Sequence, residues 1–336
     1  TGPLELNGGT LAASVNLAAP FEVNGSVNVT ISGTREHTAA WSGAGTANLN
    51  IGNNTFSLRG DTTDFAGRIN LGGSTGYLRL YGSSGSPGAT FDLGTSTADL
   101  INRNGNATFE LGALAGGSGT FLGGASSVNA PSTYRIGANG VSTTFAGTIG
   151  DGGLGGVTNI VKTGGGTLTL TGSGGHTGTT TVSEGALAVN GTLASATTVA
   201  SGATLLGSGT LSGATTTAAG ARVSPGPASG EIGTLTAAGG FTAASTTFFM
   251  QLSSAPGGVN DKLSITGGTG QVSGTNTFDI TFAAGVLGAG NYKLIQCAAG
   301  IPLNVGSGMV MNLTLSVPEI GRAHAELQSP NTNSYA

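Results

Sequence analysis

The chain has 336 residues, a formal net charge of −4, 8% charged residues and 64 glycines. An average protein has about 25% charged residues and about 7% glycine. The Lys and Arg residues are scattered singly, which excludes a basic nucleic-acid-binding face. No apolar run approaches the roughly 20 residues of a membrane-spanning helix, and 38% hydrophobic residues with so little charge exclude a disordered chain.

Residues 1–33 alternate between apolar and polar positions. The clearest segments are Leu4-Glu5-Leu6, Phe21-Glu22-Val23 and Val27-Asn28-Val29-Thr30-Ile31. Period two between Asn-Gly and Ser-Gly pairs predicts short strands joined by tight turns. Asn24-Gly25 suits either a hairpin turn or the corner of a coil, because both residues tolerate positive φ.

A second pattern runs from about residue 46, with two apolar residues around a polar one and a closing glycine. Its copies are Leu49-Asn50-Ile51-Gly52, Ile69-Asn70-Leu71-Gly72, Phe91-Asp92-Leu93-Gly94, Phe109-Glu110-Leu111-Gly112 and Tyr134-Arg135-Ile136-Gly137. The closing glycines therefore return at somewhat uneven intervals, as the coils of an irregular repeat would. The pattern predicts strands with one dry and one solvent-facing side.

The stretch Lys162–Asn190 introduces a repeat that the following residues restate. Thr180–Leu187 is echoed by Thr197–Thr204 and Thr215–Arg222, and the glycines in register, Gly185, Gly202 and Gly220, are almost evenly spaced. A fixed period of about 20 residues built from short strands is typical of a β-solenoid with one coil per repeat.

The predicted fold class is therefore all-β, a single parallel β-solenoid of roughly 15 coils, with no helix before residue 318. Parallel ladders between residues 186–189 and 203–206 would establish this fold. A β-sandwich, the alternative, would instead contain antiparallel hairpins.

Proline marks the end of the regular coils. Ser224-Pro225-Gly226-Pro227 predicts a loop or a corner, because proline cannot donate to a ladder. Longer strands with more aromatic residues follow and favour a capping section. These strands are expected at Thr246–Leu252, Lys262–Thr266, Thr277–Phe282 and Tyr292–Ile295.

Four sections result from these changes. They are degenerate coils over 1–144, regular coils over 145–224, a distal capping-like section over 225–318 and a foreign tail over 319–336. The tail resembles the in-frame translation of a sequencing adapter, and the chain begins at Thr1 without Met or signal peptide. We therefore expect a fragment or a processed product whose natural sequence continues past Pro318.

Lys162–Asn190 resembles the autotransporter-associated β-strand repeat, and Phe145–Gly150 is similar to its usual lead-in. Ser224-Pro225-Gly226, Ile232–Thr236 and Asp261–Ile265 are similar to the distal part of such passengers. The resemblance implies a right-handed parallel β-helix from a bacterial surface or secreted protein, extracellular or associated with the outer membrane. It also implies translocation machinery in the full-length protein.

Candidate chemistry is sparse. Nucleophilic catalysis of the Ser-His-Asp type needs a histidine as base; His176 is interpreted as a polar turn residue of the repeat and His37 as a solvated loop residue. Cys297 is interpreted as a small buried hydrophobe that cannot form an internal disulfide.

A second possible catalytic chemistry would use carboxylates, because glycosidases need two facing carboxyl groups. Asp61 and Asp64 form a local pair near Arg59 and Arg68, which we interpret as a charged turn. The glycine runs 116–120 and 207–213 match neither a calcium nonapeptide nor a dinucleotide loop. We therefore assign no catalytic, cofactor-binding or metal-binding residue, and expect no cofactor.

An aromatic platform for sugars could come from Trp41, Tyr77 and Tyr81, although we interpret them as core or stacking residues. The predicted function is a non-enzymatic stalk or adhesin whose partners are surface glycans or host and matrix molecules. The alternative is a β-helical lyase or glycosidase acting on polysaccharide. A groove with three or more carboxylates and an Arg or Lys would favour this alternative.

Overall fold

A computed structural model describes residues 2–82, 84–125, 127–282, 289–306 and 310–315, the last segment by its backbone. The predicted tail 319–336 lies outside these residues. The chain divides into two compact units, Thr1–Thr180 and Thr181–Ala336, and β21 (Thr179–Val182) spans their boundary.

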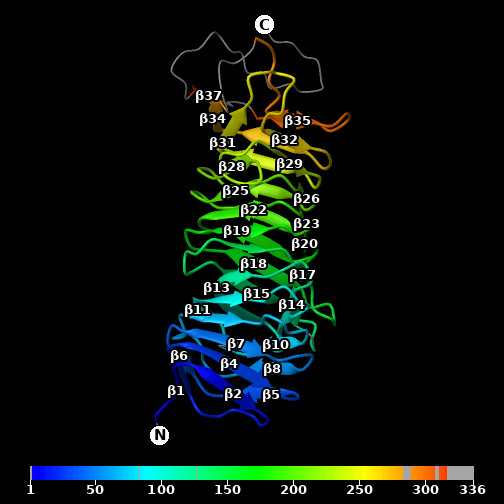
Figure 1. Ribbon diagram of the computed structural model, residues 1–336. Helices are drawn as coiled ribbons and strands as arrows, with labels where there is room; N and C mark the ends of the chain where they lie inside the picture. The colour runs from blue at the N-terminus through cyan, green and yellow to red at the C-terminus, as the bar shows by residue number, and fades with distance from the viewer. Residues whose placement is uncertain (1, 83, 126, 283–288, 307–309, 316–336) are drawn as a thin grey trace. The chain divides into compact units, whose positions relative to one another are not determined.

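The first unit is a stack of short strands arranged in sheets (Figure 1). One sheet has the order β1 (Leu4–Leu6), β3 (Phe21–Val23), β6 (Trp41–Ser42). A second sheet contains β2 (Gly9–Ala13), β4 (Ser26–Ile31), β7 (Thr46–Asn50), β9 (Arg68–Asn70), β11 (Ser86–Asp92), β13 (Ala107–Ala115), β15 (Ser132–Ile136) and β18 (Thr158–Lys162). A third contains β5 (Arg35–His37), β8 (Thr55–Leu58), β10 (Tyr77–Leu80), β12 (Asp99–Asn102), β14 (Phe121–Ala125), β17 (Thr148–Gly150) and β20 (Ser173–Gly174). β16 (Thr143–Phe145) pairs with β19 (Thr167–Leu170).

The second unit has the same construction with three sheets. The first contains β24 (Ala196–Val199), β27 (Thr215–Thr217), β30 (Phe241–Ala244), β33 (Gly270–Ser273) and β36 (Leu303–Val305). The second contains β23 (Thr192–Leu193), β26 (Thr210–Leu211), β29 (Thr234–Ala237), β32 (Lys262–Ile265) and β35 (Ile295–Cys297). The third contains β22 (Ala186–Val189), β25 (Thr204–Gly207), β28 (Arg222–Pro225), β31 (Thr247–Leu252), β34 (Thr275–Phe282) and β37 (Val310–Leu315).

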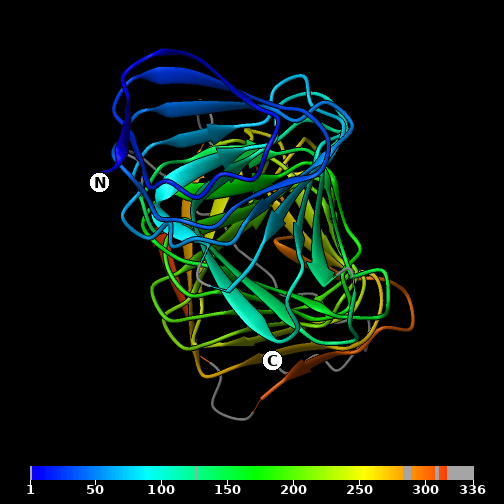
Figure 2. The ribbon, with the colours of Figure 1, turned by 90° about the horizontal axis from the view of Figure 1, so that it is seen from below.

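Parallel pairing between successive turns confirms the predicted fold class. β22 pairs with β25 in parallel, with Ala186 opposite Thr204 and Leu187 opposite Leu205. Strand pairs elsewhere in the described residues are parallel as well. Figure 2, seen from below, shows the blue and cyan strands of the first unit following one another in layers. The β-sandwich alternative is therefore excluded, and no helix occurs in the described residues.

Over the described residues, the number of turns is somewhat lower than the roughly 15 expected. The reason is that many turns are longer than the period that the repeat predicts. Thr197 pairs with Thr215, in agreement with the repeat. The next partners along this sheet, Phe241, Gly270 and Leu303, follow at progressively longer intervals in the chain.

The glycines in register turn the corners of the coils. Gly185, Gly202 and Gly220 have φ of 62°, 79° and 81°, in the left-handed region that L side chains rarely adopt. Their repetition in the sequence therefore follows from a backbone requirement that returns once per turn.

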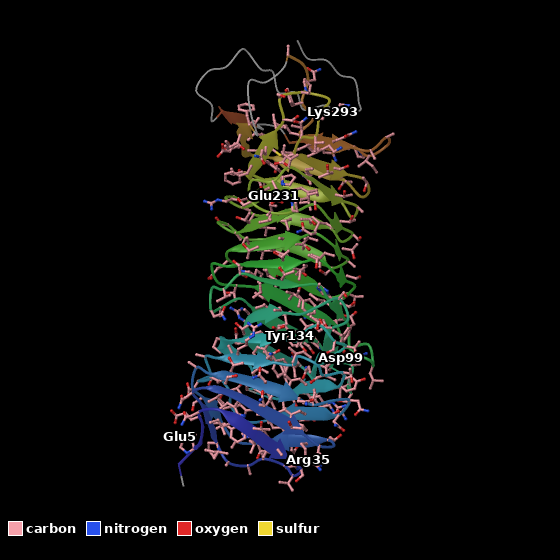
Figure 3. All side chains as sticks on the ribbon, viewed as in Figure 1. Glu5, Arg35, Asp99, Tyr134, Glu231 and Lys293 are labelled. Carbon is pink, nitrogen blue, oxygen red and sulfur yellow. The ribbon has the colours of Figure 1, made fainter. Side chains whose placement is uncertain are left out.

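The apolar positions of the second pattern form the interior, as predicted. All ten, from Leu49 and Ile51 to Tyr134 and Ile136, are at most 1% exposed. Tyr134, labelled in Figure 3, is fully buried and its hydroxyl donates to the Gly123 carbonyl.

Aligning the copies of the second pattern by their closing glycines predicts which residues lie opposite each other. The strand pairing differs from this alignment at two of the four steps between successive copies. Ile69 lies opposite Ala47 rather than Leu49, and Phe91 lies opposite Leu114 rather than Phe109. Phe91 with Ile69 and Tyr134 with Phe109 are paired as expected. The first slip shifts the strand by two positions, so the same side chains still face inward.

The distal strands differ in detail from the prediction. Ser224 and Pro225 end strand β28 rather than forming a loop, and the loop begins at Gly226. Pro225 is tolerated because it pairs only with β25, whereas the pairing of β28 with β31 ends at Val223, so on that side Pro225 lies at an edge. The last expected strand begins at Ile295 instead of Tyr292.

Candidate ligand-binding surface

We expected His37 to be a solvated loop residue. It is instead a buried residue of a strand. It ends β5 with 0% exposure. Trp41 Nε1 donates to His37 Nδ1 over 3.0 Å, and His37 Nε2 lies 3.0 Å from the Ala19 carbonyl oxygen. Because the indole N–H can only donate, Nδ1 accepts and Nε2 carries the proton of a neutral imidazole. Burial lowers the pKa of His37 and favours this neutral form.

His176 lies in the turn of the repeat, as predicted, but it is buried there. Its exposure is 0%, and its Nε2 lies 3.0 Å from Thr180 Oγ1. Its Nδ1 is buried and has no hydrogen-bond partner among the described residues. The neighbouring Thr177 donates from its amide and hydroxyl to the Asp151 carboxylate. The ring therefore secures the turn and is not presented to a substrate.

Acidification should weaken the fold through His176. Burial lowers its pKa to about 4, against a smaller opposing effect of Asp151. A folded-state pKa below the ordinary 6.5 contributes stability above pH 6.5 that is lost as the pH falls towards 4. We expect a loss of up to about 3 kcal/mol at pH 4. The measurement is the urea unfolding free energy of wild type minus that of His176→Gln between pH 7 and 4.

This difference isolates His176 from two groups with the opposite effect. Burial raises the pKa of Asp99 and of Asp261 to about 6, so both carboxyls favour the folded state as the pH falls. A wild-type-minus-variant difference that stays flat from pH 7 to 4 would contradict the role of His176.

Asp61 is held within its own turn. Asp61 Oδ1 accepts from the amide and the hydroxyl of Thr63, which lowers the pKa of this carboxyl. This geometry confirms the predicted charged turn. The two arginines pair elsewhere, Arg59 with Glu36 and Arg68 with Asp92.

The three aromatic residues do not form a platform. Trp41 is 1% exposed and packs against Phe21 and Phe65, whereas Tyr77 on β10 is 42% exposed. The Arg59 guanidinium lies 4.4 Å from the ring centroid of Tyr81. The Arg79 guanidinium lies 5.7 Å from the ring centroid of Tyr77. Trp41 is therefore a core residue, and Tyr77 and Tyr81 are residues stacked against arginines, as predicted.

Neither a metal cluster nor a membrane-spanning helix occurs in the described residues, and Cys297 is only partly buried. In the described part of the chain, no group of three or more His, Cys, Asp or Glu side chains is arranged to hold a metal ion. Over the same residues no helix is long and apolar enough to cross a membrane. Cys297 is half-buried at the end of β35 rather than fully buried, and burial raises the pKa of its thiol.

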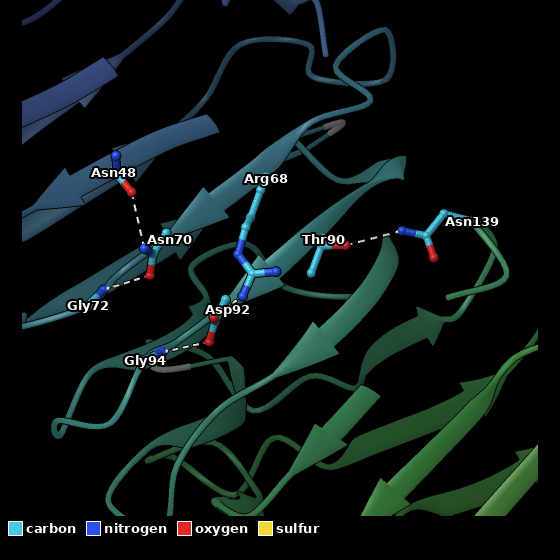
Figure 4. A network of polar contacts seen from close by, with 8 residues as sticks. All are labelled: Asn48, Arg68, Asn70, Gly72, Thr90, Asp92, Gly94 and Asn139. Carbon is cyan, nitrogen blue, oxygen red and sulfur yellow. Dashed lines mark hydrogen bonds and ion pairs between the residues drawn. The ribbon is translucent and has the colours of Figure 1, made fainter. Parts of the chain in front are cut away.

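A column of polar side chains follows the outer face of the first unit. Thr10, Asn28, Asn48, Asn70 and Asp92 occupy the same position on successive strands. Asn48 donates to Asn28 Oδ1 over 3.2 Å, and Asn70 donates to Asn48 Oδ1 over 3.0 Å. Figure 4 shows the second of these bonds and the bonds from Gly72 N to Asn70 and from Gly94 N to Asp92. We call these five residues the polar column.

Further polar contacts flank the polar column. Arg68 forms an ion pair with Asp92, and Asn139 donates to Thr90 Oγ1 over 3.3 Å. A shallow cavity of about 420 Å³ lies along the column between Thr10 and Gly73. This face offers amide and hydroxyl groups at a spacing of about 4.8 Å, which suits polar ligands with repeated hydrogen-bonding groups.

Removing one member of the column should cost stability. Asn70→Ala deletes the bonds to Asn48 and to the Gly72 amide, so we expect a loss of about 1–2 kcal/mol in the free energy of unfolding. Thermal or urea unfolding measures it. Asn50→Ala is the control, because Asn50 is exposed and outside the column. Equal stabilities of the two variants would argue against the column as a stabilising network.

The polar column and Lys162 were missed by sequence reasoning. Lys162 is 1% exposed, and its ammonium donates to the carbonyls of Thr163 and Gly164 over 2.7 and 2.8 Å. The column could have been found by aligning Asn28, Asn48 and Asn70 as equivalent positions of successive coils. No signal in the sequence marks Lys162 as buried.

Comparison with known protein families gives a match to the passenger-associated-transport-repeat over residues 160–189. A comparison with curated proteins gives no match. The matched repeat is nearly the same stretch as Lys162–Asn190, which resembles the autotransporter-associated β-strand repeat. Together with the parallel β-solenoid, it fits an autotransporter passenger repeat protein.

Proposed function

We propose that this chain is the stalk or adhesive part of a secreted or surface-displayed passenger, and that it acts without catalysis. The observation that carries the proposal is the passenger-associated-transport-repeat at residues 160–189, built into stacked parallel coils. That repeat implies a passenger that reaches the cell surface or the medium, and translocation machinery in the full-length protein.

The side chains support a structural role. The interior consists mainly of apolar residues stacked from turn to turn, and both buried histidines are engaged in local hydrogen bonds. Parallel ladders satisfy the backbone groups of one turn with those of the next, so each turn supports its neighbours. The polar column on the first unit gives such a scaffold a surface for glycans or for host and matrix molecules.

Two measurements test the proposal. The chain fused between a secretion signal and a translocator barrel should become accessible to external protease and antibody on intact cells. Retention inside the cell would contradict the passenger role.

The purified chain should bind a glycan or matrix array and release no unsaturated or reducing sugar from a panel of polysaccharides. Release of such sugars would replace the proposal with the polysaccharide-degrading alternative.

A further inference from the structure

The second unit contains a cavity of about 290 Å³, lined by both polar and apolar side chains, on the outer face of its third sheet. Its floor comes from strands β31 and β34, where Phe249 lies opposite Asp279 and Gln251 lies opposite Thr281. Neighbouring strands are about 4.8 Å apart, and residues two positions apart on one strand are separated by about 6.6 Å. These four side chains therefore outline a site with the dimensions of one sugar ring.

An insertion in the coil covers this floor. The step from Thr215 to its partner Phe241 is longer than the preceding step from Thr197 to its partner Thr215. The longer step contains the loop 226–233, whose Ser229 and Gly230 line the cavity. The floor and the loop together make a partly enclosed space that an ordinary coil would not have.

Asp261 holds the loop and the floor together. It is 2% exposed, and its two oxygens accept from the amides of Gly233 and Gln251 over 2.7 and 2.6 Å. Asn190 fixes the other side of the loop by donating to the Pro227 carbonyl over 2.9 Å. These bonds preorganise the cavity, so that a ligand need not order the loop.

Two acceptors in the lining lack a donor among the side chains and backbone groups that the structure describes. They are the buried oxygens Gln251 Oε1 and Asp279 Oδ1. An unsatisfied buried acceptor is unfavourable, and a ligand that supplies a donor removes this penalty. The terminal torsions of Asp and Gln are broad, so small rotations bring these oxygens to a bound hydroxyl.

Phe249 and Arg222 complete the recognition chemistry. Phe249 is half-buried on a face where its neighbours at alternate positions are Thr247 and Gln251. Its ring provides an apolar surface for the C–H face of a sugar. Arg222 lines the same cavity and supplies hydrogen-bond donors, which complement the acceptor Asp279. The carboxylate disfavours an anionic ligand and the guanidinium disfavours a cationic one, so the lining favours a neutral ligand.

We propose that this cavity binds one neutral pyranose residue, with its ring on Phe249 and vicinal hydroxyls between Asp279, Gln251 and Arg222. The inference rests on the adhesive role proposed above and gives that role a specific site. It adds a sugar site on the second unit to the polar column proposed as a binding surface on the first.

The test is a titration of the full chain with methyl glycosides of neutral hexoses, uronic acids and amino sugars, followed by saturation-transfer NMR. We expect saturable binding of a neutral hexoside and weaker binding of the charged ones. Phe249→Ala and Asp279→Asn should each weaken it by about tenfold or more. Thr277→Ala, on the same face of β34 but outside the cavity, should leave it unchanged.

Absence of saturable binding by every neutral hexoside would overturn the proposal, as would equal affinities of wild type, Phe249→Ala and Asp279→Asn. Circular dichroism on each variant checks that it is folded, so that only the affinities of folded proteins are compared. A glycan array run on the same variants separates the two proposals. Array binding that survives both substitutions rejects the cavity but retains the adhesive role; hexoside binding with a silent array retains the cavity and rejects the adhesive role.

Discussion

Trp41→Ala should lower the free energy of unfolding of the first unit by about 3–5 kcal/mol. Trp41 is 1% exposed, and its ring lies 5.5 Å from that of Phe21 and 5.7 Å from that of Phe65. Replacing it by alanine removes a large buried surface and leaves a cavity that the stacked strands cannot easily close. It also leaves His37 Nδ1 without its donor. Urea unfolding followed by circular dichroism measures the loss.

Two matched variants separate the causes of this loss. Trp41→Phe keeps most of the ring packing and removes the N–H, so it should cost about 1–3 kcal/mol, the penalty of one unsatisfied buried acceptor. Tyr77→Ala removes a ring that is 42% exposed and should cost much less. If Trp41→Ala unfolded at the same urea concentration as Tyr77→Ala, the cluster around Trp41 would not be a stabilising core.

In a solenoid, the loss of stability caused by Trp41→Ala should be confined to the turns near Trp41. Each turn contacts its neighbours, so stability is approximately a sum of local contributions. Hydrogen exchange in Trp41→Ala should accelerate at β3 and β6, which pair directly, and remain unchanged at β31. Uniform acceleration across both strands and β31 would instead indicate a single cooperative unit.

The parts of the fold that could be predicted are those that repeat. Inward and outward residues alternate in strands such as β4, β15 and β31, and a left-handed corner recurs at Gly185, Gly202 and Gly220. Both features are local, so they are visible without knowing which turns are neighbours. The register was harder, because Ala47 can fill the inner position opposite Ile69 as well as Leu49 can. A slip by two positions keeps the same face inward and leaves no trace in the pattern.

The candidate sites depend on contacts between turns, and the sequence contains no local sign of them. His37 follows Arg35 and Glu36, so its surroundings in the sequence are polar, yet it is the inward residue of β5. Phe248 and Phe249 are adjacent, and only the strand's orientation decides that the first is buried and the second lines the cavity. The proline residues near 226 indicated a loop but not what that loop covers.

The burial of Lys162 could not be predicted from the sequence either, although this residue belongs to the repeat. It sits at the end of β18, a strand whose burial alternates, in the position that faces inward. The next residues turn a corner at Gly164, with φ of 67°, and the carbonyls of Thr163 and Gly164 there accept from its ammonium. A lysine can reach them because its long stem packs along the apolar interior while its three donors satisfy polar groups.

Lys162→Met should therefore destabilise the chain by about 3–6 kcal/mol, since hydrogen bonds from a charged donor contribute about 1.5–3 kcal/mol each. Methionine matches the stem in volume, so the loss reports the missing donors rather than a cavity. The measurement is the urea unfolding free energy. Lys262→Met is the control, because Lys262 is an outward residue of β32 and its replacement should change stability by about 0.5 kcal/mol or less.

The sign of the Lys162→Met effect is decided by the two carbonyls. Removing a buried charge also removes the cost of its desolvation. Where no polar partner is left without a hydrogen bond, such replacements often leave the free energy of unfolding unchanged or increase it. Here the carbonyls of Thr163 and Gly164 stay at the inner corner of the turn, so the unsatisfied acceptors should outweigh that gain. A Lys162→Met chain as stable as wild type would mean that water replaces the ammonium at this corner.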